Sequence, residues 1–98
     1  MAASILTITV RFHGVLRQIT GRAVETLALP AGTSLQGSLE RLVEEHGPAL
    51  GSLLLDPEGT LSSQFVLFRN GKLTYRAEAE SLLAEGDELM LFPRVSGG

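Results

Sequence analysis

The sequence contains no cysteine, and only two of its 98 residues are histidines. Without cysteine the chain has no disulfide framework, no thiolate metal site and no thiol nucleophile. His13 and His46 have no second histidine or cysteine at a short spacing, so no metal site is expected. His46 falls on the apolar side of a predicted helix, where it is expected to pack or to interact with the helix dipole. His13 is expected in a loop or at the surface.

Concentrated positive charge and long apolar runs are also missing. The net charge is −3, the pI is near 5.3 and the eight basic residues are scattered, which argues against a nucleic-acid partner. No stretch approaches the roughly 20 apolar residues of a membrane span. "MAASILTITV" has no positively charged segment before its apolar residues, so we expect a mature, cytoplasmic chain with no membrane partner.

Sequence motifs for catalysis are missing as well. The chain has no Gly-x-Ser-x-Gly elbow, no P-loop and no Gly-x-Gly-x-x-Gly fingerprint, so we expect no enzyme activity from the chain alone and no bound cofactor. Neighbouring acids, such as Glu44 with Glu45 and Asp87 with Glu88, are interpreted as solvated surface charge.

Length and composition fit a single domain over residues 1–98. Of these residues 44% are hydrophobic and 19% are charged, which is typical of a globular chain. A domain of this size buries roughly 60–70% of its unfolded surface and needs no covalent staple.

Hydrophobic periodicity predicts two strands near the start. "ILTITVRF" (residues 5–12) alternates apolar and polar residues, as expected of a half-buried strand. Residues 13–21 have apolar residues at helical spacing and end on Gly21, which predicts a short helical turn. Residues 23–32 return to alternation, and this second strand is expected to end at Pro30 and Gly32.

Residues 33–48 form the clearest predicted helix. Thr33 is placed as the N-cap with Gln36 at the third helical position, a pair that can form a capping box. An apolar stripe follows at helical spacing, and Gly47-Pro48 is expected to end the helix. The stripe consists of Leu35, Leu39, Leu42, Val43 and His46.

The second half predicts mainly strands. Residues 49–64 are expected to connect the helix to the next strand, although their leucine run also fits a second short helix, and "DPEG" is a turn signature. Residues 65–75 surround Asn70-Gly71, which favours a type I′ hairpin. A helical or turn segment around Leu82 and Leu83, a turn at 86–87 and a strand over 88–92 follow.

This order of elements predicts an α+β roll. One main helix is expected to pack across one face of a mixed sheet. The first and last strands are expected to lie side by side in parallel, because a long connection separates them. This arrangement directs the C-terminus out of the sheet.

Residues 93–98 are therefore interpreted as a flexible Gly-Gly tail. Pro93 lacks an amide donor and is expected to stop sheet pairing, after which the chain is free to leave the body. Gly97 and Gly98 have no side chains, so they can enter a narrow channel. The carboxylate of Gly98, with an ordinary pKa of about 3.3–3.7, is ionised at neutral pH and can attack the α-phosphate of ATP in a partner enzyme.

The segment "EGDELMLFPRVSGG" resembles the C-terminus of the ubiquitin-like sulfur carriers (the MoaD/ThiS family), especially the small subunit of molybdopterin synthase. The order of elements is similar to the β-grasp fold of that family. The resemblance implies a carrier for molybdenum cofactor biosynthesis. Gly98 would be adenylated with ATP by a ubiquitin-activating-like adenylyltransferase and converted to a thiocarboxylate, and Gly97 would give access.

The resemblance also implies a hetero-oligomer with the large synthase subunit. Phe92, Pro93 and Val95 would dock the tail, and Arg94 and Ser96 lie in the same partner-binding segment. Arg94 stands where the family usually has a second proline, and is expected to add charge and flexibility. The segment around 53–63 is longer than a minimal family member needs.

Other functions remain open. Related carriers serve thiamine synthesis, cysteine synthesis or tRNA thiolation, and some are protein modifiers that form an isopeptide bond through Gly98. A third hypothesis is an interaction domain with a passive tail. Its sheet would bind through Phe65, Phe68 and Phe92, although each of these is expected to be core.

Overall fold

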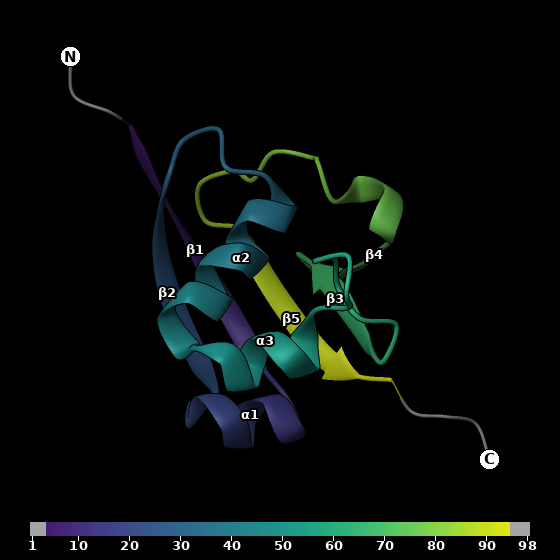
Figure 1. Cartoon of the computed structure of the whole chain (residues 1–98). Helices are drawn as coiled ribbons and strands as arrows, with labels where there is room; N and C mark the ends of the chain where they lie inside the picture. Colours follow the sequence, from purple (N-terminus) through teal and green to yellow (C-terminus); the bar gives the residue numbers. More distant parts are fainter. Residues whose placement is uncertain (1–3, 95–98) are drawn as a thin grey trace.

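The computed structural model describes residues 4–94, which form one sheet with helices packed on it. Figure 1 shows the elements in chain order from the N-terminus to the end of the last strand. They are β1 (Ile5–Phe12), α1 (Val15–Thr20), β2 (Val24–Pro30), α2 (Leu35–His46), α3 (Pro48–Leu54), β3 (Phe65–Arg69), β4 (Lys72–Thr74), the 3₁₀ turn η1 (Arg76–Glu78) and β5 (Glu88–Pro93).

The strands form a mixed sheet in the order β2-β1-β5-β3-β4. The first and last strands are parallel neighbours at the centre, with Val10 opposite Leu89 and Phe12 opposite Leu91. The other pairings are antiparallel. The predicted α+β roll and the parallel pairing of its first and last strands are both confirmed, and β5 runs toward the same end of the sheet as β1.

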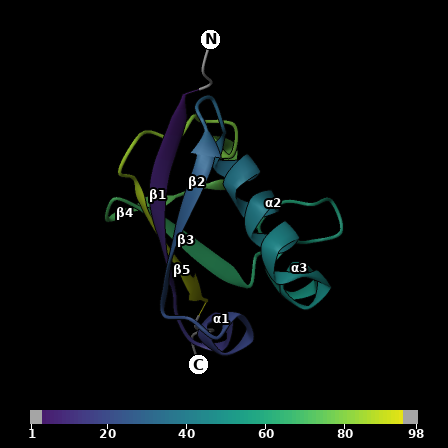
Figure 2. The same cartoon turned by 90° about the vertical axis from the view of Figure 1, so that its left-hand side faces the viewer.

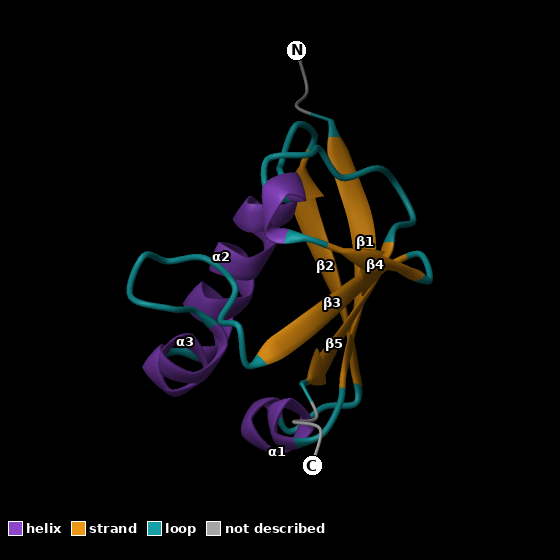
Figure 3. Ribbon diagram, turned by 90° about the vertical axis from the view of Figure 1, so that its right-hand side faces the viewer, coloured by secondary structure: helices purple, strands orange, loops and turns teal. Residues whose placement is uncertain are grey.

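One face of the sheet supplies the core. In β1 every second side chain is buried, from Leu6 to Phe12, as the alternating sequence predicts. Figures 2 and 3 show α2 and α3 on this face, with α1 at the end where β5 finishes. The buried apolar residues are Leu6, Ile8, Val10, Phe12, Leu16, Leu27, Leu29, Leu35, Leu39, Leu42, Leu50, Leu54, Phe65, Leu67, Leu83, Leu89 and Leu91.

The predicted capping box at the start of α2 is wrong by one residue. Ser34, in extended conformation, is the N-cap, and its hydroxyl accepts a hydrogen bond of 3.0 Å from the amide of Gly37. Thr33 instead donates its hydroxyl to the carbonyl of Pro30 at 2.6 Å. The side chain of Gln36 reaches away from the helix start and donates to the carbonyl of Gly59 at 2.6 Å.

The segment after α2 contains a helix where a connection was expected. Gly47, at φ 93°, ends α2 and turns the chain, and Pro48 begins α3. Proline fits the first helical turn because its missing amide has no intrahelical partner there. Leu50 and Leu54, four residues apart, are fully buried, so the core selects the helical alternative for this leucine run.

The predicted hairpin between β3 and β4 is confirmed. Asn70 and Gly71 both have positive φ, 52° and 83°, as a type I′ turn requires. The segment after β4 contains the short turn η1, and beyond it Leu82 forms an isolated bridge with Ser34. Leu83 is buried in the core, whereas Leu82 is exposed.

Candidate functional site

The predicted site residues divide at Arg94. Val95, Ser96, Gly97 and Gly98 lie outside the described residues, so their predicted roles stay predictions. Phe92 and Pro93 end β5, and Arg94 follows directly. The part of the site that the structure describes is therefore the end of β5 together with Arg94.

Phe92 lies on the face of the sheet opposite the helices. Its ring stacks on the ring of His13, with centroids 4.0 Å apart and planes 8° from parallel. It also meets Phe68 edge-on at 5.7 Å. His13 lies in the loop between β1 and α1, as predicted, but its ring is partly buried against Phe92. Its Nε2 is buried with no hydrogen-bond partner among the residues described.

Pro93 and Arg94 are attached to the body, contrary to the prediction that the chain is free from Pro93 onward. Pro93 pairs with Phe65 within the sheet. The amide of Arg94 donates to the carbonyl of Gln64 at 2.6 Å, and its Nε donates to the carbonyl of Ser63 at 2.9 Å. Successive amides of a strand point to opposite sides, so the amide that Pro93 lacks would face away from β3 and its absence costs no pairing there. Arg94 therefore restrains the chain instead of loosening it.

Apolar side chains gather on the same open face around Phe92. Val66 lies opposite Phe92, and Phe68 lies opposite both Met90 and Leu73 in the strand register. Leu73 is exposed and the other four are partly buried, in contrast to their buried neighbours on the helix-covered face. We call the set the apolar sheet patch: Val66, Phe68, Leu73, Met90 and Phe92.

The three phenylalanines proposed for a binding face have different positions. Phe65 points into the core and is 4% exposed, so the core prediction is confirmed for this residue. Phe68 and Phe92 are half-buried on the open face, where no described element covers them. Contiguous apolar groups on an otherwise polar surface are typical of protein-binding sites.

The two histidines can be placed among the residues 4–94 that the structure describes. No group of three or more His, Cys, Asp or Glu side chains there is placed to hold a metal ion. His46 Nε2 lies 2.6 Å from Glu25 Oε1, and its ring meets the edge of Phe12 at 6.0 Å. His46 therefore packs against its neighbours, as the sequence predicts, and its carboxylate partner Glu25 is an addition that the sequence did not predict. In the same range, no helix is both long and apolar enough to cross a bilayer.

Two carboxyl groups have pKa values below the usual range for aspartate. For Asp87, burial alone raises the pKa, but hydrogen bonds from the Ala84 amide, Asn70 and Arg69, together with the Arg69 charge, outweigh it and lower the pKa overall. The hydroxyl of Thr60 makes the largest contribution to the lowered pKa of Asp56. Asp87 is buried, so interpreting it as solvated charge is wrong. Its network depends on residues 17 and 18 positions away, a separation that local sequence cannot reveal.

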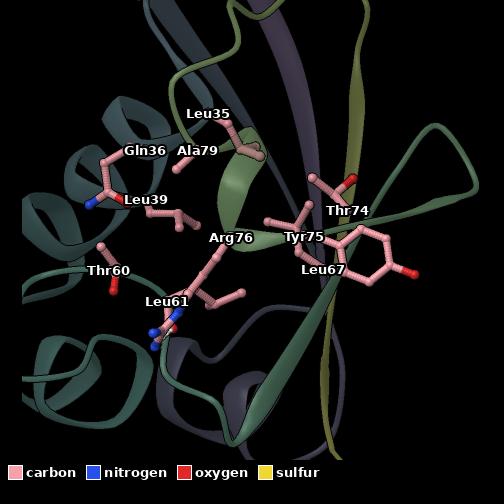
Figure 4. A pocket seen from close by; sticks show the side chains of 10 residues that line it. All are labelled: Leu35, Gln36, Leu39, Thr60, Leu61, Leu67, Thr74, Tyr75, Arg76 and Ala79. Carbon is pink, nitrogen blue, oxygen red and sulfur yellow. Dashed lines mark hydrogen bonds between the residues drawn. The ribbon is translucent and has the colours of Figure 1, made fainter.

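A small cavity between α2 and η1 has a volume of about 30 Å³. Leu35 and Leu39 line it from α2, and Arg76 and Ala79 close it from the segment after β4, while the Tyr75 ring points away (Figure 4). A hollow of this size holds roughly one water molecule, so it is not a site for a small-molecule substrate.

Comparisons with known proteins agree with this architecture. A profile of the ThiS family matches residues 10–98. Small archaeal modifier protein 1 of Haloferax volcanii is 35% identical over 83 residues, covering 85% of this chain and 91% of that relative. The crystal structure of SAMP1 from Haloferax volcanii superposes with a TM-score of 0.79 at 32% identity, covering 94% of this chain and 99% of that one.

A second similar structure concerns the predicted molybdopterin role. It is described as a putative molybdopterin converting factor, subunit 1, from Pyrococcus furiosus, and has a TM-score of 0.76 over 92% of this chain and 99% of that one. Its identity is only 20%, so it shows the fold alone. The β-grasp fold is thus confirmed, whereas the relatives above 30% identity are modifiers by name and do not single out molybdopterin synthase. The chain belongs to the ThiS family of ubiquitin-like β-grasp sulfur carriers and modifiers.

Proposed function

We propose that the chain is a ubiquitin-like carrier that an E1-like adenylating enzyme activates at the carboxylate of Gly98. The 35% identity to a small archaeal modifier, over most of both chains, is the observation that carries this proposal. The position of β5 supports it, because this strand ends beside the apolar sheet patch and leads directly to the C-terminal residues. A partner bound on the patch would thus also be close to the start of the tail.

The activation step needs only the carboxylate and ATP. A carboxylate oxygen of Gly98 forms a bond to the α-phosphorus while the bond to the β-phosphate oxygen breaks, giving an acyl-adenylate and pyrophosphate. The adenylate is a good leaving group, so the acyl carbon becomes open to nucleophiles. A glycine offers this carbon with no side chain beside it.

The acyl-adenylate has two fates in this proposal. An amine of a target lysine forms a C–N bond with the acyl carbon, AMP leaves and one proton is released, giving an isopeptide. Hydrosulfide instead forms a C–S bond and displaces AMP, giving a thiocarboxylate. The name of the 35%-identical relative favours the modifier fate, and we propose it first.

The small-subunit role in molybdopterin synthase is the second candidate. The stretch "GDELMLFP" before the terminal "GG" favours it, through its resemblance to such subunits. In this role the partner is the large synthase subunit, and the thiocarboxylate of Gly98 gives up its sulfur there. Carriers for thiamine synthesis or tRNA thiolation share the same first step.

Intact-protein mass spectrometry tests the proposal. The chain is incubated with ATP and the E1-like enzyme of the same genome, with hydrosulfide or with a cell extract as the acceptor. We expect either one oxygen replaced by sulfur at Gly98 or conjugates of higher mass. A chain carrying a C-terminal amide at Gly98 is the matched control, since it differs only in the carboxylate and should give neither product.

Loss of the last two glycines separates this proposal from an interaction domain with a passive tail. Deleting Gly97 and Gly98 should abolish both products while leaving the unfolding temperature nearly unchanged, since chain termini generally contribute few stabilising contacts. Retained biological function in the deletion variant or in the amide would contradict the proposal.

A further inference from the structure

The loop before β3 holds the chain one residue beyond the end of β5. Phe65 pairs with Pro93, and the two preceding residues, Ser63 and Gln64, supply the carbonyls that Arg94 contacts. Both the main chain and the side chain of Arg94 are engaged, at 2.6 Å and 2.9 Å. Two hydrogen bonds from one residue to adjacent carbonyls fix its orientation more tightly than a single bond does.

The loop after β1 holds the same segment from its other side. The His13 ring stacks on Phe92, and the His13 amide donates to the carbonyl of Leu91 at 3.2 Å. Gly14, with φ 62° and ψ −135°, passes so close to Pro93 that a Cβ on Gly14 would lie 2.7 Å from Pro93 Cγ. Only glycine readily adopts this backbone conformation, and only glycine leaves room for the proline ring.

We propose that residues 13–14 and 63–64 form an exit clamp, which fixes the direction in which the chain leaves the sheet at Phe92, Pro93 and Arg94. Arg94 is then a positioning residue for adenylation, and this inference rests on the proposed function above. A chain that enters a partner's channel loses backbone freedom, and residues already fixed in the free protein add nothing to that cost. The clamp lowers the concentration of carrier that the activating enzyme needs, without touching the reacting atoms.

A different role for Arg94 makes a different prediction. If its positive charge contacted an acidic partner surface, lysine would replace it well. In the exit clamp, lysine fails because it lacks the planar Nε–H that reaches Ser63. Arg94→Lys and Arg94→Ala therefore separate the two roles.

ATP–pyrophosphate exchange by the E1-like enzyme of the same genome provides the measurement, at a series of carrier concentrations. Arg94→Lys and Arg94→Ala should each raise the KM for the carrier by about fivefold, which corresponds to the roughly 1 kcal/mol of one hydrogen bond, with kcat unchanged. A purely structural contact would lower the unfolding temperature but leave KM unchanged at a temperature where the variant stays folded.

Two glycine variants test the other side of the exit clamp. Gly14→Ala should displace Pro93 and raise KM, whereas Gly21→Ala should not. Gly21 also has positive φ, 73°, but an added Cβ there meets nothing within 4 Å. If Gly14→Ala fails to fold, the Arg94 variants decide the result.

The KM and kcat of the two Arg94 variants decide whether the exit clamp exists. A raised KM with unchanged kcat in both Arg94 variants supports the exit clamp. An unchanged KM in both overturns it, and so does an impaired Arg94→Ala beside a normal Arg94→Lys, because that result assigns a charge contact. If the unmodified chain gives no ATP–pyrophosphate exchange at all, the proposed function itself is wrong, and the exit clamp is wrong with it.

Discussion

At the scale of single residues, Asp87 connects two turns that lie far apart in the sequence. Its Oδ2 accepts hydrogen bonds from the Arg69 side chain at 2.7 Å and from the Ala84 amide at 2.8 Å, while Oδ1 accepts from Asn70 Nδ2 at 2.8 Å. Asn70 Oδ1 in turn accepts a hydrogen bond from the amide of Glu88. The β3–β4 hairpin is thereby fixed to the turn that starts β5, the strand leading to Arg94.

Asp87→Asn should destabilise the fold by roughly 1–3 kcal/mol, because it leaves the half-buried Arg69 guanidinium without its charge partner. The effect should depend on pH. The pKa of Asp87 is lower in the folded protein than its ordinary value of 3.8, so its stabilisation is present above that value and is lost as pH falls through the folded pKa. Urea unfolding at pH 6 and pH 3 checks this. The difference in the free energy of unfolding between the wild-type chain and the variant should be smaller at pH 3. An equal difference at both values would contradict the assignment.

At the scale of elements, the start of α2 depends on a segment far away in the sequence. The amides of Leu35 and Gln36 donate to the carbonyls of Ser81 and Ala79, and Ser34 caps the helix. Thr33 and Ser34 are both good N-cap residues, so local sequence cannot choose between them. The segment 79–81 makes the choice, because it accepts the first two helical amides and leaves that of Gly37 to Ser34.

Ser34→Ala should therefore destabilise the protein by about 1 kcal/mol, as expected for loss of an N-cap hydroxyl. Thr33→Ala is the matched control, since its exposed bond to the Pro30 carbonyl satisfies no helical amide and its loss should cost less. Chemical denaturation of both variants measures the two changes in the free energy of unfolding. A larger loss of stability for Thr33→Ala than for Ser34→Ala would contradict the assignment of Ser34 as the N-cap.

Element prediction succeeded where the pattern has one solution. The alternation of Leu6, Ile8 and Val10 specifies strand β1, and Asn70-Gly71 specifies the turn between β3 and β4. The leucine run of α3 fits a buried helix or a buried connection equally well, because its burial depends on neighbours such as α1 and α2. The sequence alone therefore does not decide between a helix and a connecting segment there.

At the scale of the whole molecule, the mixed sheet was predictable because a long connection allows the first and last strands to pair in parallel. The contacts that restrain the C-terminal segment were not. The stack of His13 on Phe92 and the bonds of Arg94 to residues 63 and 64 join parts of the chain that are 79, 31 and 30 positions apart. Neither periodicity nor propensity contains this information. The sequence therefore predicts that sheet pairing stops at Pro93, whereas Pro93 pairs with Phe65 and Arg94 contacts residues 63 and 64.

The distribution of amines over the whole molecule leads to a last prediction about the modifier fate. Lys72 is the only lysine, and all other basic residues are arginines, whose guanidinium groups do not accept acyl groups under these conditions. It is exposed and follows the Asn70-Gly71 turn, which projects on the side of the sheet away from α2 and α3 (Figures 2 and 3). An isopeptide between two copies of the chain must therefore use Lys72.

Lys72→Arg should remove such homopolymers and leave conjugates to other proteins unchanged, as denaturing gels of the reaction with ATP and the E1-like enzyme would show. Trypsin cleaves after Arg94, so each isopeptide leaves the remnant Val-Ser-Gly-Gly on the modified lysine, which identifies the linkage by mass. Homopolymers that persist in the variant, with the remnant on the N-terminal amine, would contradict the assignment to Lys72. Because Lys72 lies at the opposite end of β3 from the residues that hold Arg94, the variant leaves the exit clamp intact and its KM for adenylation should not change.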